Sequence, residues 1–432
     1  MRKTLEAYYY KLRHLIPSGF LYSRFYHRLG LVLASSDSDA VQCLVTQRLR
    51  ETLLSSSMNV PFYRSLRIKI SDIKNEDPYN ILATLPYIDK DTLMDEPKAF
   101  INERAWLFFS KYATSGGSTG RGVGVWRSKS SSDIEKLFFN VRWGEFGYEG
   151  HRARTLRLAA EGIKKHDEHP VSVLGRTVLL SPYHISRLYM PLILEGLARH
   201  SFDFVHAYSG VLVELTYLLR EFQPQKMMQV KAIFLGSEPV SIEQLEILFG
   251  YWQCPIVVHY GLNERTSLGF YTYTPGDREI VYQLEPLYGI TQNPSDSHEI
   301  IGTTLWNDVM PLLNYRTKDY GLVSDGKITG LDGREQNFLI SRDGHRISGM
   351  SIVIDEASWA QIRHYQIRQR VPGKIELCIV PRHGQLSLEF RDYILSQQLN
   401  RWGGFFDISL VECATIPLTP AGKTRHVDVQ LS

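Results

Sequence analysis

The glycine-rich segment TSGGSTG, residues 114–120, contains residue types that could bind an anion. Glycine lets a backbone come close to a phosphate, while backbone N–H groups and small hydroxyls donate hydrogen bonds to its oxygens. Apolar residues stand on both sides, WLFF at 106–109 and VGVW at 123–126, so the segment predicts a loop between two strands. The candidate phosphate-binding residues are Thr114, Ser115, Gly116, Gly117, Ser118, Thr119 and Gly120.

Three motifs with known mechanisms fit this segment less well. A Walker A loop needs lysine where Val123 stands, and a dinucleotide-binding fingerprint needs glycine where Val125 stands. The run from Gly116 to Gly120 matches G-x-S-x-G, the nucleophile elbow of α/β-hydrolases. That elbow requires a helix directly after the serine, whereas a strand pattern follows here. Taken alone, the segment could also be a solvated hairpin loop.

Two strand ends are further candidates for a site. Short apolar runs alternate with helical patterns between residues 170 and 260, which predicts βαβ units and a mostly parallel sheet. Ligands of such sheets bind where the strands end. AIFLGSEP (232–239) and PIVVHYGLNE (255–264) both run from a buried strand into small and polar residues. We therefore expect a site at these two strand ends.

Periodicity and turn signals predict the remaining elements. Helices are expected at 40–54 and 130–143, the second with a capping box of Ser132 and Glu135. Antiparallel strands are expected from 270 to 330, followed by an α+β region with a hairpin turn at Asp343 and Gly344 and a last strand at 407–416. The fold class is α/β, with βαβ-type sheets and a small antiparallel barrel-like region in a large N-terminal domain, and a small mobile α+β C-terminal domain.

Composition excludes several classes of protein. The chain has 432 residues, more than one core usually supports, and its net charge of +3 is too small to predict nucleic-acid binding. Its four cysteines lack the short spacings of a zinc site or a disulfide framework, which favours a reducing cytoplasm. Residues 1–39 are basic and tyrosine-rich at the start, and we expect an interface helix there in preference to peripheral membrane contact. An oligomer is compatible with the sequence.

Six segments resemble motifs of the adenylate-forming superfamily, the acyl-CoA synthetases and adenylation domains. The resemblance covers residues 40–432 and follows the family order. TSGGSTGRG (114–122) is similar to its phosphate loop, GSEP (236–239) to its adenine-contacting turn, and HYGLNE (259–264) to its tyrosine-glycine-x-x-glutamate segment. YRTKD (315–319) is similar to its ribose-binding segment, GREQN (333–337) to its hinge, and PLTPAGKTR (417–425) to its C-terminal lysine loop.

The N-terminal part resembles one branch of that superfamily in particular. VPFYR (60–64) and LPYIDKDTL (85–93) are similar to segments of the phenylacetate-CoA ligase and CapK-like branch. The resemblance implies an ATP- and acid-binding domain at 40–335 and a mobile domain at 336–432 that carries a catalytic lysine. It implies formation of an acyl-adenylate from ATP and a carboxylic acid, with release of pyrophosphate, and then acyl transfer.

The resemblance also implies roles for single residues. Lys423 would lie beside the carboxylate and the α-phosphate, and Glu264 would help to hold Mg²⁺ on the ATP phosphates. Asp319 would accept hydrogen bonds from the ribose hydroxyls, and Arg334 would contact ribose or phosphate. The residues that would frame the adenine, with Tyr260 stacking on it, are Gly236, Ser237, Glu238, Pro239, His259, Tyr260 and Gly261.

The acid pocket would lie near SPYHIS (181–186) and AYSGV (207–211). Its candidates are Tyr183, His184, Tyr208 and Ser209, which could equally be core aromatics and a hydrogen-bonded histidine. Coenzyme A is the acceptor that the resemblance favours. An amine or hydroxyl acceptor, as in polysaccharide or specialised metabolism, and a non-catalytic nucleotide-binding module are the alternatives.

The chain departs from the family pattern at three places. Lys318 stands where relatives commonly have glycine, and Gln336 with Asn337 replaces an aspartate pair at the hinge. Asn263 replaces a threonine or serine before Glu264, and its amide still offers a donor and an acceptor. None of these changes removes a charge that adenylation needs.

Overall fold

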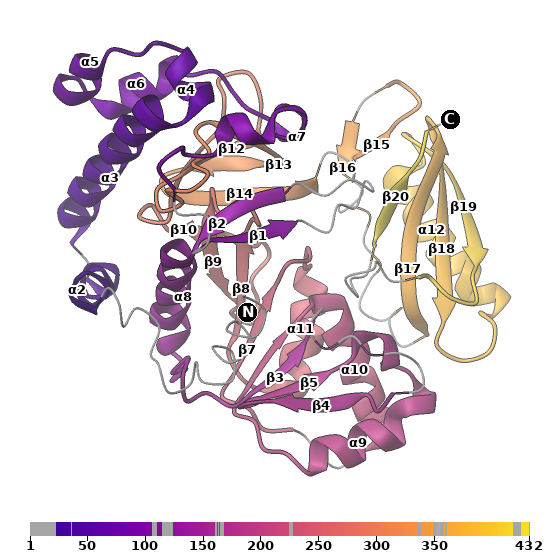
Figure 1. Ribbon diagram of the computed structural model, residues 1–432. Coiled ribbons are helices and arrows are strands. Elements are labelled where there is room, and N and C mark those ends of the chain that lie inside the picture. Colours follow the sequence, from indigo (N-terminus) through magenta and orange to yellow (C-terminus); the bar gives the residue numbers. More distant parts are fainter. Residues whose placement is uncertain are drawn as a thin grey trace.

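The computed structural model describes a large central sheet with a smaller sheet beside it (Figure 1). The described residues are 23–35, 37–105, 110–114, 124–159, 162, 164, 168–223, 228–334, 338–344, 346–348, 352, 354, 358, 361–417 and 425–431.

The central sheet has twelve strands in the order β11-β12-β13-β14-β10-β9-β8-β7-β6-β3-β5-β4. Strands β5, β3, β6, β7 and β8 are parallel, and from β8 onward the pairing is antiparallel. The predicted antiparallel region is therefore present and continues the parallel sheet. The strands are β3 (Thr155–Leu158), β4 (Val171–Leu174), β5 (Thr177–Leu180), β6 (Phe204–Ala207), β7 (Ala232–Gly236), β8 (Ile256–Gly261), β9 (Leu268–Thr272), β10 (Tyr282–Leu284), β11 (Gly289–Gln292), β12 (Glu299–Thr304), β13 (Tyr315–Ser324) and β14 (Lys327–Arg334).

Helices cover both faces of the parallel strands. On one face lie α9 (Met190–Ala198), α10 (Ser209–Phe222) and α11 (Ile242–Trp252), preceded by the short turns η5 (Pro182–His184) and η6 (Arg187–Tyr189); on the other lies α8 (Lys129–Gly144). In β7, Ile233 and Leu235 join the core with α10, whereas Ala232 and Phe234 join the core with α8. Successive strand residues point to opposite faces, so one strand serves both cores.

N-terminal helices complete the α8 side of the molecule (Figure 1). They are α2 (Ser23–Ala34), α3 (Ser38–Asn59), α4 (Pro61–Ser65), α5 (Ile70–Asn75), α6 (Pro78–Thr84), α7 (Lys90–Asp95) and η2 (Pro97–Phe100). Leu29 and Leu33 of α2 are buried in this core, so the described part of the predicted extension packs as an interface helix. Residues 1–22 lie outside the described residues, and membrane contact there stays a prediction. Among the described helices, none combines the length and apolar character that crossing a membrane requires.

The start of α8 differs from the prediction. Its N-cap is Ser128, whose side chain accepts a hydrogen bond from the Ser131 N–H, so the predicted capping box of Ser132 with Glu135 is wrong. Strand β2 (Gly124–Ser128) ends at Ser128, which places the cap four residues earlier. Glu135 is thereby free of a capping role and pairs with Arg265 instead.

The C-terminal sheet has four strands in the order β19-β18-β17-β20, with α12 (Leu388–Trp402) beside them. Its strands are β17 (Ile362–Val371), β18 (Lys374–Pro381), β19 (Asp407–Glu412) and β20 (Val427–Val429). The predicted hairpin is confirmed as β15 (Phe338–Ile340) and β16 (Arg346–Ser348). Strand β20 was not predicted, because three residues are too few to show an alternating pattern.

A buried ion triad joins this sheet to α10. Glu214 of α10 accepts hydrogen bonds from Arg363 of β17 at 2.9 Å and from Arg382, directly after β18, at 3.3 Å. The carboxylate is 3% exposed, and the Arg382 guanidinium also lies 4.0 Å from the centroid of the Tyr217 ring. Arg363 donates a further bond to the Ile185 carbonyl at 2.6 Å. These contacts fix the C-terminal sheet against the helix that follows β6.

Two histidines of the C-terminal sheet make its stability sensitive to acid. Burial, with the charges of Arg363 and Arg382, lowers the pKa of His364 to about 3, and burial lowers the pKa of His426 to about 4. Since the unfolded chain binds protons near pH 6.5, their stabilisation is complete above that pH and is lost as the pH falls toward 4. When the pH is lowered from 7.5 to 4.5, we expect the free energy of unfolding to fall less in His364→Gln than in the wild type. Urea titrations at the two pH values measure this fall. The exposed His151→Gln variant should lose as much as the wild type, and an equal loss in both variants would contradict this account.

Candidate active site

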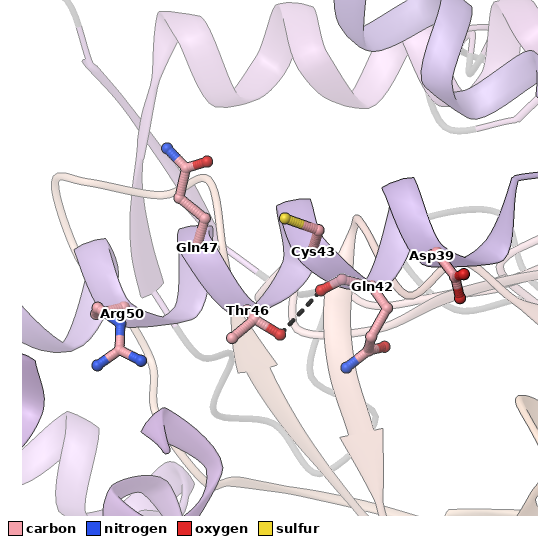
Figure 2. Close-up of a pocket in the computed structure, with 6 residues that line it drawn as sticks. All are labelled: Asp39, Gln42, Cys43, Thr46, Gln47 and Arg50. Atoms are coloured by element: carbon pink, nitrogen blue, oxygen red, sulfur yellow. Dashed lines mark hydrogen bonds between the residues drawn. The ribbon is translucent and has the colours of Figure 1, made fainter. Parts of the chain in front are cut away.

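A hollow of about 470 Å³ lies along the outer side of α3 and is not the predicted site (Figure 2). Asp39, Gln42, Cys43, Thr46, Gln47 and Arg50 line it, all from one helix. The Arg50 guanidinium already donates to the carbonyls of Lys74 and Glu76, at 3.0 and 2.8 Å, at the end of α5. None of the residues predicted from the sequence contributes to this hollow.

The glycine-rich segment connects two paired strands, as predicted, although the first strand is at 110–114 and the apolar run 106–109 lies outside the described residues. β1 (Ser110–Thr114) and β2 are antiparallel, with Thr114 opposite Gly124, and a helix begins only at Lys129. This order does not fit a nucleophile elbow, which places a helix directly after its serine. Ser115, Gly116, Gly117, Ser118, Thr119 and Gly120 lie outside the described residues, and for Thr114 the structure describes the backbone only.

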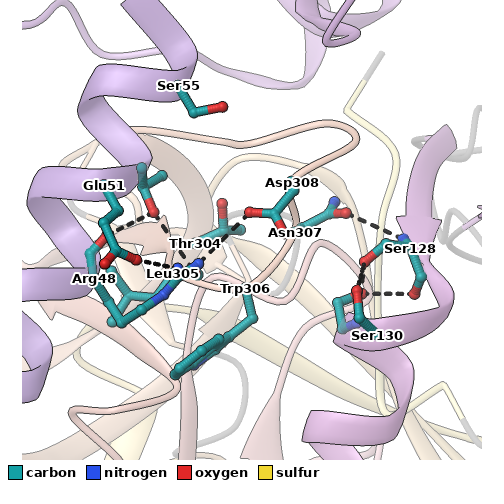
Figure 3. A network of polar contacts seen from close by, with 12 residues as sticks. Arg48, Glu51, Ser55, Ser128, Ser130, Thr304, Leu305, Trp306, Asn307 and Asp308 are labelled. Atoms are coloured by element: carbon teal, nitrogen blue, oxygen red, sulfur yellow. Dashed lines mark hydrogen bonds and ion pairs between the residues drawn. The ribbon is translucent and has the colours of Figure 1, made fainter. Parts of the chain in front are cut away.

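Asn307 fixes the strand that leaves this loop (Figure 3). Its amide donates to the carbonyls of Trp126 and Met310 at 2.8 and 2.9 Å, and its Oδ1 accepts from the Ser128 N–H at 3.3 Å. Arg48 of α3 donates to the Leu305 carbonyl at 2.8 Å in the same segment. The segment after β12 therefore contacts both α3 and the hairpin of β1 and β2, here called the glycine hairpin.

The turn after β8 is tied to β2 by the half-buried Arg127 and to α8 by the buried Arg265. Arg127 of β2 donates to the backbone carbonyl and to Oδ1 of Asn263, directly before Glu264. Arg265, directly after it, donates to Glu135 at 2.6 Å and to Ser131 at 2.9 Å, both on α8. Burial and the charge of Arg265 lower the pKa of Arg127. Two cations thus flank Glu264 next to β2, an arrangement suited to a polyanion.

Two tyrosine hydroxyls link this turn to β13. Tyr260 donates to Asp319 Oδ2 at 3.0 Å, and Tyr315 donates to Glu264 Oε1 at 3.3 Å. All four side chains are buried. The predicted adenine, metal and ribose residues therefore lie at one place, although β9, β10 and β14 separate β8 from β13 in the sheet.

The turn after β7 brings a third predicted segment to this edge. Glu238 accepts from the Gly210 N–H at 3.2 Å and from the Ser209 hydroxyl at 3.4 Å, at the start of α10. Gly236 is required here, because a Cβ at this position would lie 1.9 Å from Cε1 of the His259 ring. His259 and Tyr260 point to opposite faces of the sheet, so they contact different surroundings.

Residues in the left-handed region adjoin the predicted acidic groups. Seven described non-glycine residues have positive φ, and three of them are Ser237 (φ 66°), Arg265 (φ 59°) and Lys318 (φ 61°), next to Glu238, Glu264 and Asp319. Such strain costs energy and concentrates at functional sites, which supports this edge as the site. It also explains the glycine of relatives at position 318, because glycine adopts this conformation without a steric penalty.

Lys318→Gly should therefore stabilise the protein. We expect the free energy of unfolding to rise by up to about 1 kcal/mol. Glycine removes the steric penalty of the left-handed conformation, and the greater entropy of glycine in the unfolded chain offsets part of that gain. Lys327→Gly, on the same hairpin but in ordinary strand conformation, should instead cost about 0.5–1 kcal/mol. Urea unfolding of the three proteins measures both effects, and a destabilised Lys318→Gly variant would contradict this explanation.

The acid-pocket candidates lie near the start of α10 and on η5. His184 is buried, its Nδ1 lies 2.8 Å from the Ser181 hydroxyl, and its ring lies 4.5 Å from that of Tyr189. Ser209 is buried and donates to the Pro239 carbonyl at 2.9 Å, and Tyr208 is the buried N-cap residue of α10. Tyr183 is half-buried beside them. Their role toward an acid stays a prediction.

The side chains of two charged candidates, Lys423 and Arg334, lie outside the described part of the structure. Lys423 lies outside the described residues, as do Gln336 and Asn337 of the hinge, and Arg334 is described as backbone at the end of β14. Asp319 is the register partner of Arg334, so the ribose-binding and hinge segments are adjacent strands.

Sequence reasoning missed Arg127, Arg265 and Tyr315 as parts of this site. Tyr315 is the first residue of YRTKD, and Arg265 directly follows HYGLNE. These positions are the only signal that the sequence offers. No group of three or more His, Cys, Asp or Glu side chains able to hold a metal occurs in the part of the chain that the structure describes. Glu264 alone fits Mg²⁺ bound mainly by ATP phosphates, since this ion commonly takes one or two carboxylates beside phosphate oxygens.

The comparisons with protein-family models and with curated proteins give no match. Among solved structures, the chain is similar to 2-hydroxyisobutyryl-CoA ligase in the postadenylation state. With R3-HIB-AMP bound, that structure gives a TM-score of 0.63 at 14% identity, covering 89% of both chains. With 2-HIB-AMP bound, the values are 0.61 and 15%, again with 89% of both chains covered.

This likeness confirms the predicted fold class. The chain has the fold of the adenylate-forming acyl-CoA ligases, which the six motifs predicted. The phenylacetate-CoA ligase and CapK-like branch stays a prediction.

Proposed function

We propose that the protein is an ATP-dependent, AMP-forming carboxylate ligase. A carboxylate oxygen attacks the α-phosphorus of ATP, the bond from that phosphorus to the bridging oxygen breaks, and pyrophosphate leaves with the bonding electrons. The observation that carries the proposal is the meeting of three predicted segments, with Tyr260 bonded to Asp319 and Tyr315 bonded to Glu264 beside the glycine hairpin.

The described residues would bind the nucleotide. Asp319, held by Tyr260, would accept from the ribose hydroxyls, and the turn of Gly236–Pro239 with Tyr260 would frame the adenine. The glycine hairpin would cover the phosphates, and the half-buried guanidinium of Arg127 would add positive potential behind it. Mg²⁺, when bound, would neutralise charge on the phosphates, and Glu264 would hold it there.

Acyl transfer would follow a rotation of the C-terminal domain, residues 336–432, about the hinge near 334–337. Lys423 would serve adenylation beside the carboxylate and α-phosphate. We propose coenzyme A as the acceptor, with an amine or hydroxyl of a sugar or metabolite as the alternative, and a cytoplasmic site of action. The structural neighbour is a CoA ligase captured with acyl-adenylates, which supports the first acceptor.

Carboxylate-dependent ATP–pyrophosphate exchange with a panel of acids tests the proposal. We expect exchange with at least one acid and its loss in Lys423→Ala, while the exposed Lys74→Ala keeps the wild-type rate. Absence of exchange with every acid, together with unchanged behaviour of Lys423→Ala, would favour a non-catalytic nucleotide-binding module. Exchange-positive acids can then be offered coenzyme A and amines to identify the acceptor.

A further inference from the structure

Polar side chains interrupt the aromatic core between α8 and the parallel strands. Arg157 of β3 and His206 of β6 are register partners whose side chains are in contact. His206 and His259 of β8 lie 6.0 Å apart between ring centroids. All three are half-buried and near the carboxyl ends of their strands, where ligands of parallel sheets bind.

His259 presents a hydrogen-bond acceptor to this region. One side of its ring hydrogen-bonds the Leu235 backbone, and its buried Nδ1 has no hydrogen-bond partner among the described residues. Burial, followed by the charge of Arg157, lowers the pKa of His259 to about 4. A neutral ring that donates to the Leu235 carbonyl leaves a lone pair on Nδ1 for an incoming donor.

Trp143 of α8 presents a matching donor. Its indole is 4% exposed and stacks on Phe234 of β7, with 4.1 Å between ring centroids and 8° between planes. Its Nε1 is buried and also lacks a partner among the described residues. The ring centroids of Trp143 and His259 are 6.3 Å apart, so the two unpaired nitrogens belong to neighbouring side chains of one aromatic cluster.

A hydroxyl group satisfies both atoms, because it accepts one hydrogen bond and donates another. An alkyl or aryl group placed here would leave both unpaired, and a buried polar atom without a partner costs binding energy. We propose that the acid accepted by this site carries a hydroxyl group, which accepts from Trp143 Nε1 and donates to His259 Nδ1. The inference rests on the proposed function, since it identifies the acid that the adenylating site would take.

This location adjoins the proposed adenine site and differs from the predicted acid pocket at η5 and the start of α10. His259 directly precedes Tyr260, whose side chain points to the opposite face and bonds Asp319. Gly236 of the adenine-turn candidate lies against the His259 ring. A hydroxy acid bonded to His259 would therefore adjoin the proposed adenine site from the α8 side of the sheet, with β7 and β6 between β8 and the Arg157 cation of β3.

The test uses acid pairs that differ only by a hydroxyl: lactate with propionate, 3-hydroxybutyrate with butyrate, and mandelate with phenylacetate. Binding to the full chain is measured by titration calorimetry with AMP present, and catalysis by ATP–pyrophosphate exchange. For at least one pair we expect the wild type to favour the hydroxy acid roughly 10- to 100-fold, as lost pairing of buried polar groups predicts. Trp143→Phe, which keeps the stacked ring, should bring that ratio close to one without weakening the deoxy acid.

Further variants separate this role from a structural one. His259→Leu should remove the preference, and His259→Asn, whose amide can replace Nδ1, should retain part of it. Trp402→Phe in α12 removes another buried indole N–H without a described partner and should leave the ratio unchanged. A wild type that binds both members of every pair alike, binds none of the acids, or keeps its preference in both Trp143→Phe and His259→Leu overturns the inference. Exchange without preference leaves the proposed function intact, whereas hydroxyl-dependent binding without exchange supports the inference and rejects that function.

Discussion

Glu264→Gln is expected to slow ATP–pyrophosphate exchange by roughly 100- to 1,000-fold, the effect of losing a few kcal/mol of metal-mediated charge stabilisation. The substitution keeps the shape of a 6% exposed side chain and its acceptor oxygen for Tyr315, while it removes the charge that would hold Mg²⁺. Exchange rates at increasing Mg²⁺ measure the effect, and the requirement for Mg²⁺ should rise.

Two variants control for indirect effects of this change. Tyr315→Phe removes the hydroxyl that bonds Glu264 and should cost about tenfold, the lower end for an orienting contact. Glu103→Gln, which breaks an exposed pair with Arg64 at 2.6 Å, should leave exchange unchanged. If Glu264→Gln is folded and exchanges within threefold of the wild type, Glu264 is not the metal-holding residue.

Glu214→Ala should lower the free energy of unfolding by about 3–5 kcal/mol, the usual cost of removing one partner from a buried ion pair. The variant removes the carboxylate that both Arg363 and Arg382 contact, and Arg382 is 7% exposed. Because Arg363 lies in β17 and Arg382 directly follows β18, we expect the C-terminal sheet to detach before the central sheet unfolds. Limited proteolysis between 335 and 361, alongside urea unfolding, measures both effects.

The same helix supplies the matched control. Glu221 of α10 pairs with Arg187 at 3.0 Å, but both side chains are exposed by more than a third. Glu221→Ala should therefore cost no more than about 1 kcal/mol, as exposed pairs usually do. Equal losses in the two alanine variants would show that the Arg363–Glu214–Arg382 triad contributes no more than a surface pair.

Much of the fold follows from local patterns of residues. The alternation between 170 and 260 predicted parallel strands, and the Asp343-Gly344 turn predicted the β15–β16 hairpin, because strand period and turn chemistry act over a few neighbouring residues. Because these patterns are local, they did not identify the N-cap of α8 correctly. Ser128, Ser130, Ser131 and Ser132 all suit an N-cap, and only the end of β2 decides among them.

Identifying the site required both the sequence and the tertiary structure. The sequence by itself determined which segments carry its chemistry, since HYGLNE, YRTKD and the glycine-rich segment are each contiguous and their residue types do not depend on context. Only the tertiary structure decided how they are joined: Arg127 to Asn263 across 136 residues, Tyr260 to Asp319 across 59, and Glu214 to Arg363 across 149. The physical reason is that such contacts depend on strand order and on the face each side chain takes, and no local pattern encodes either. His259 and Tyr260 illustrate this, because adjacent residues of one motif serve opposite faces of the same strand.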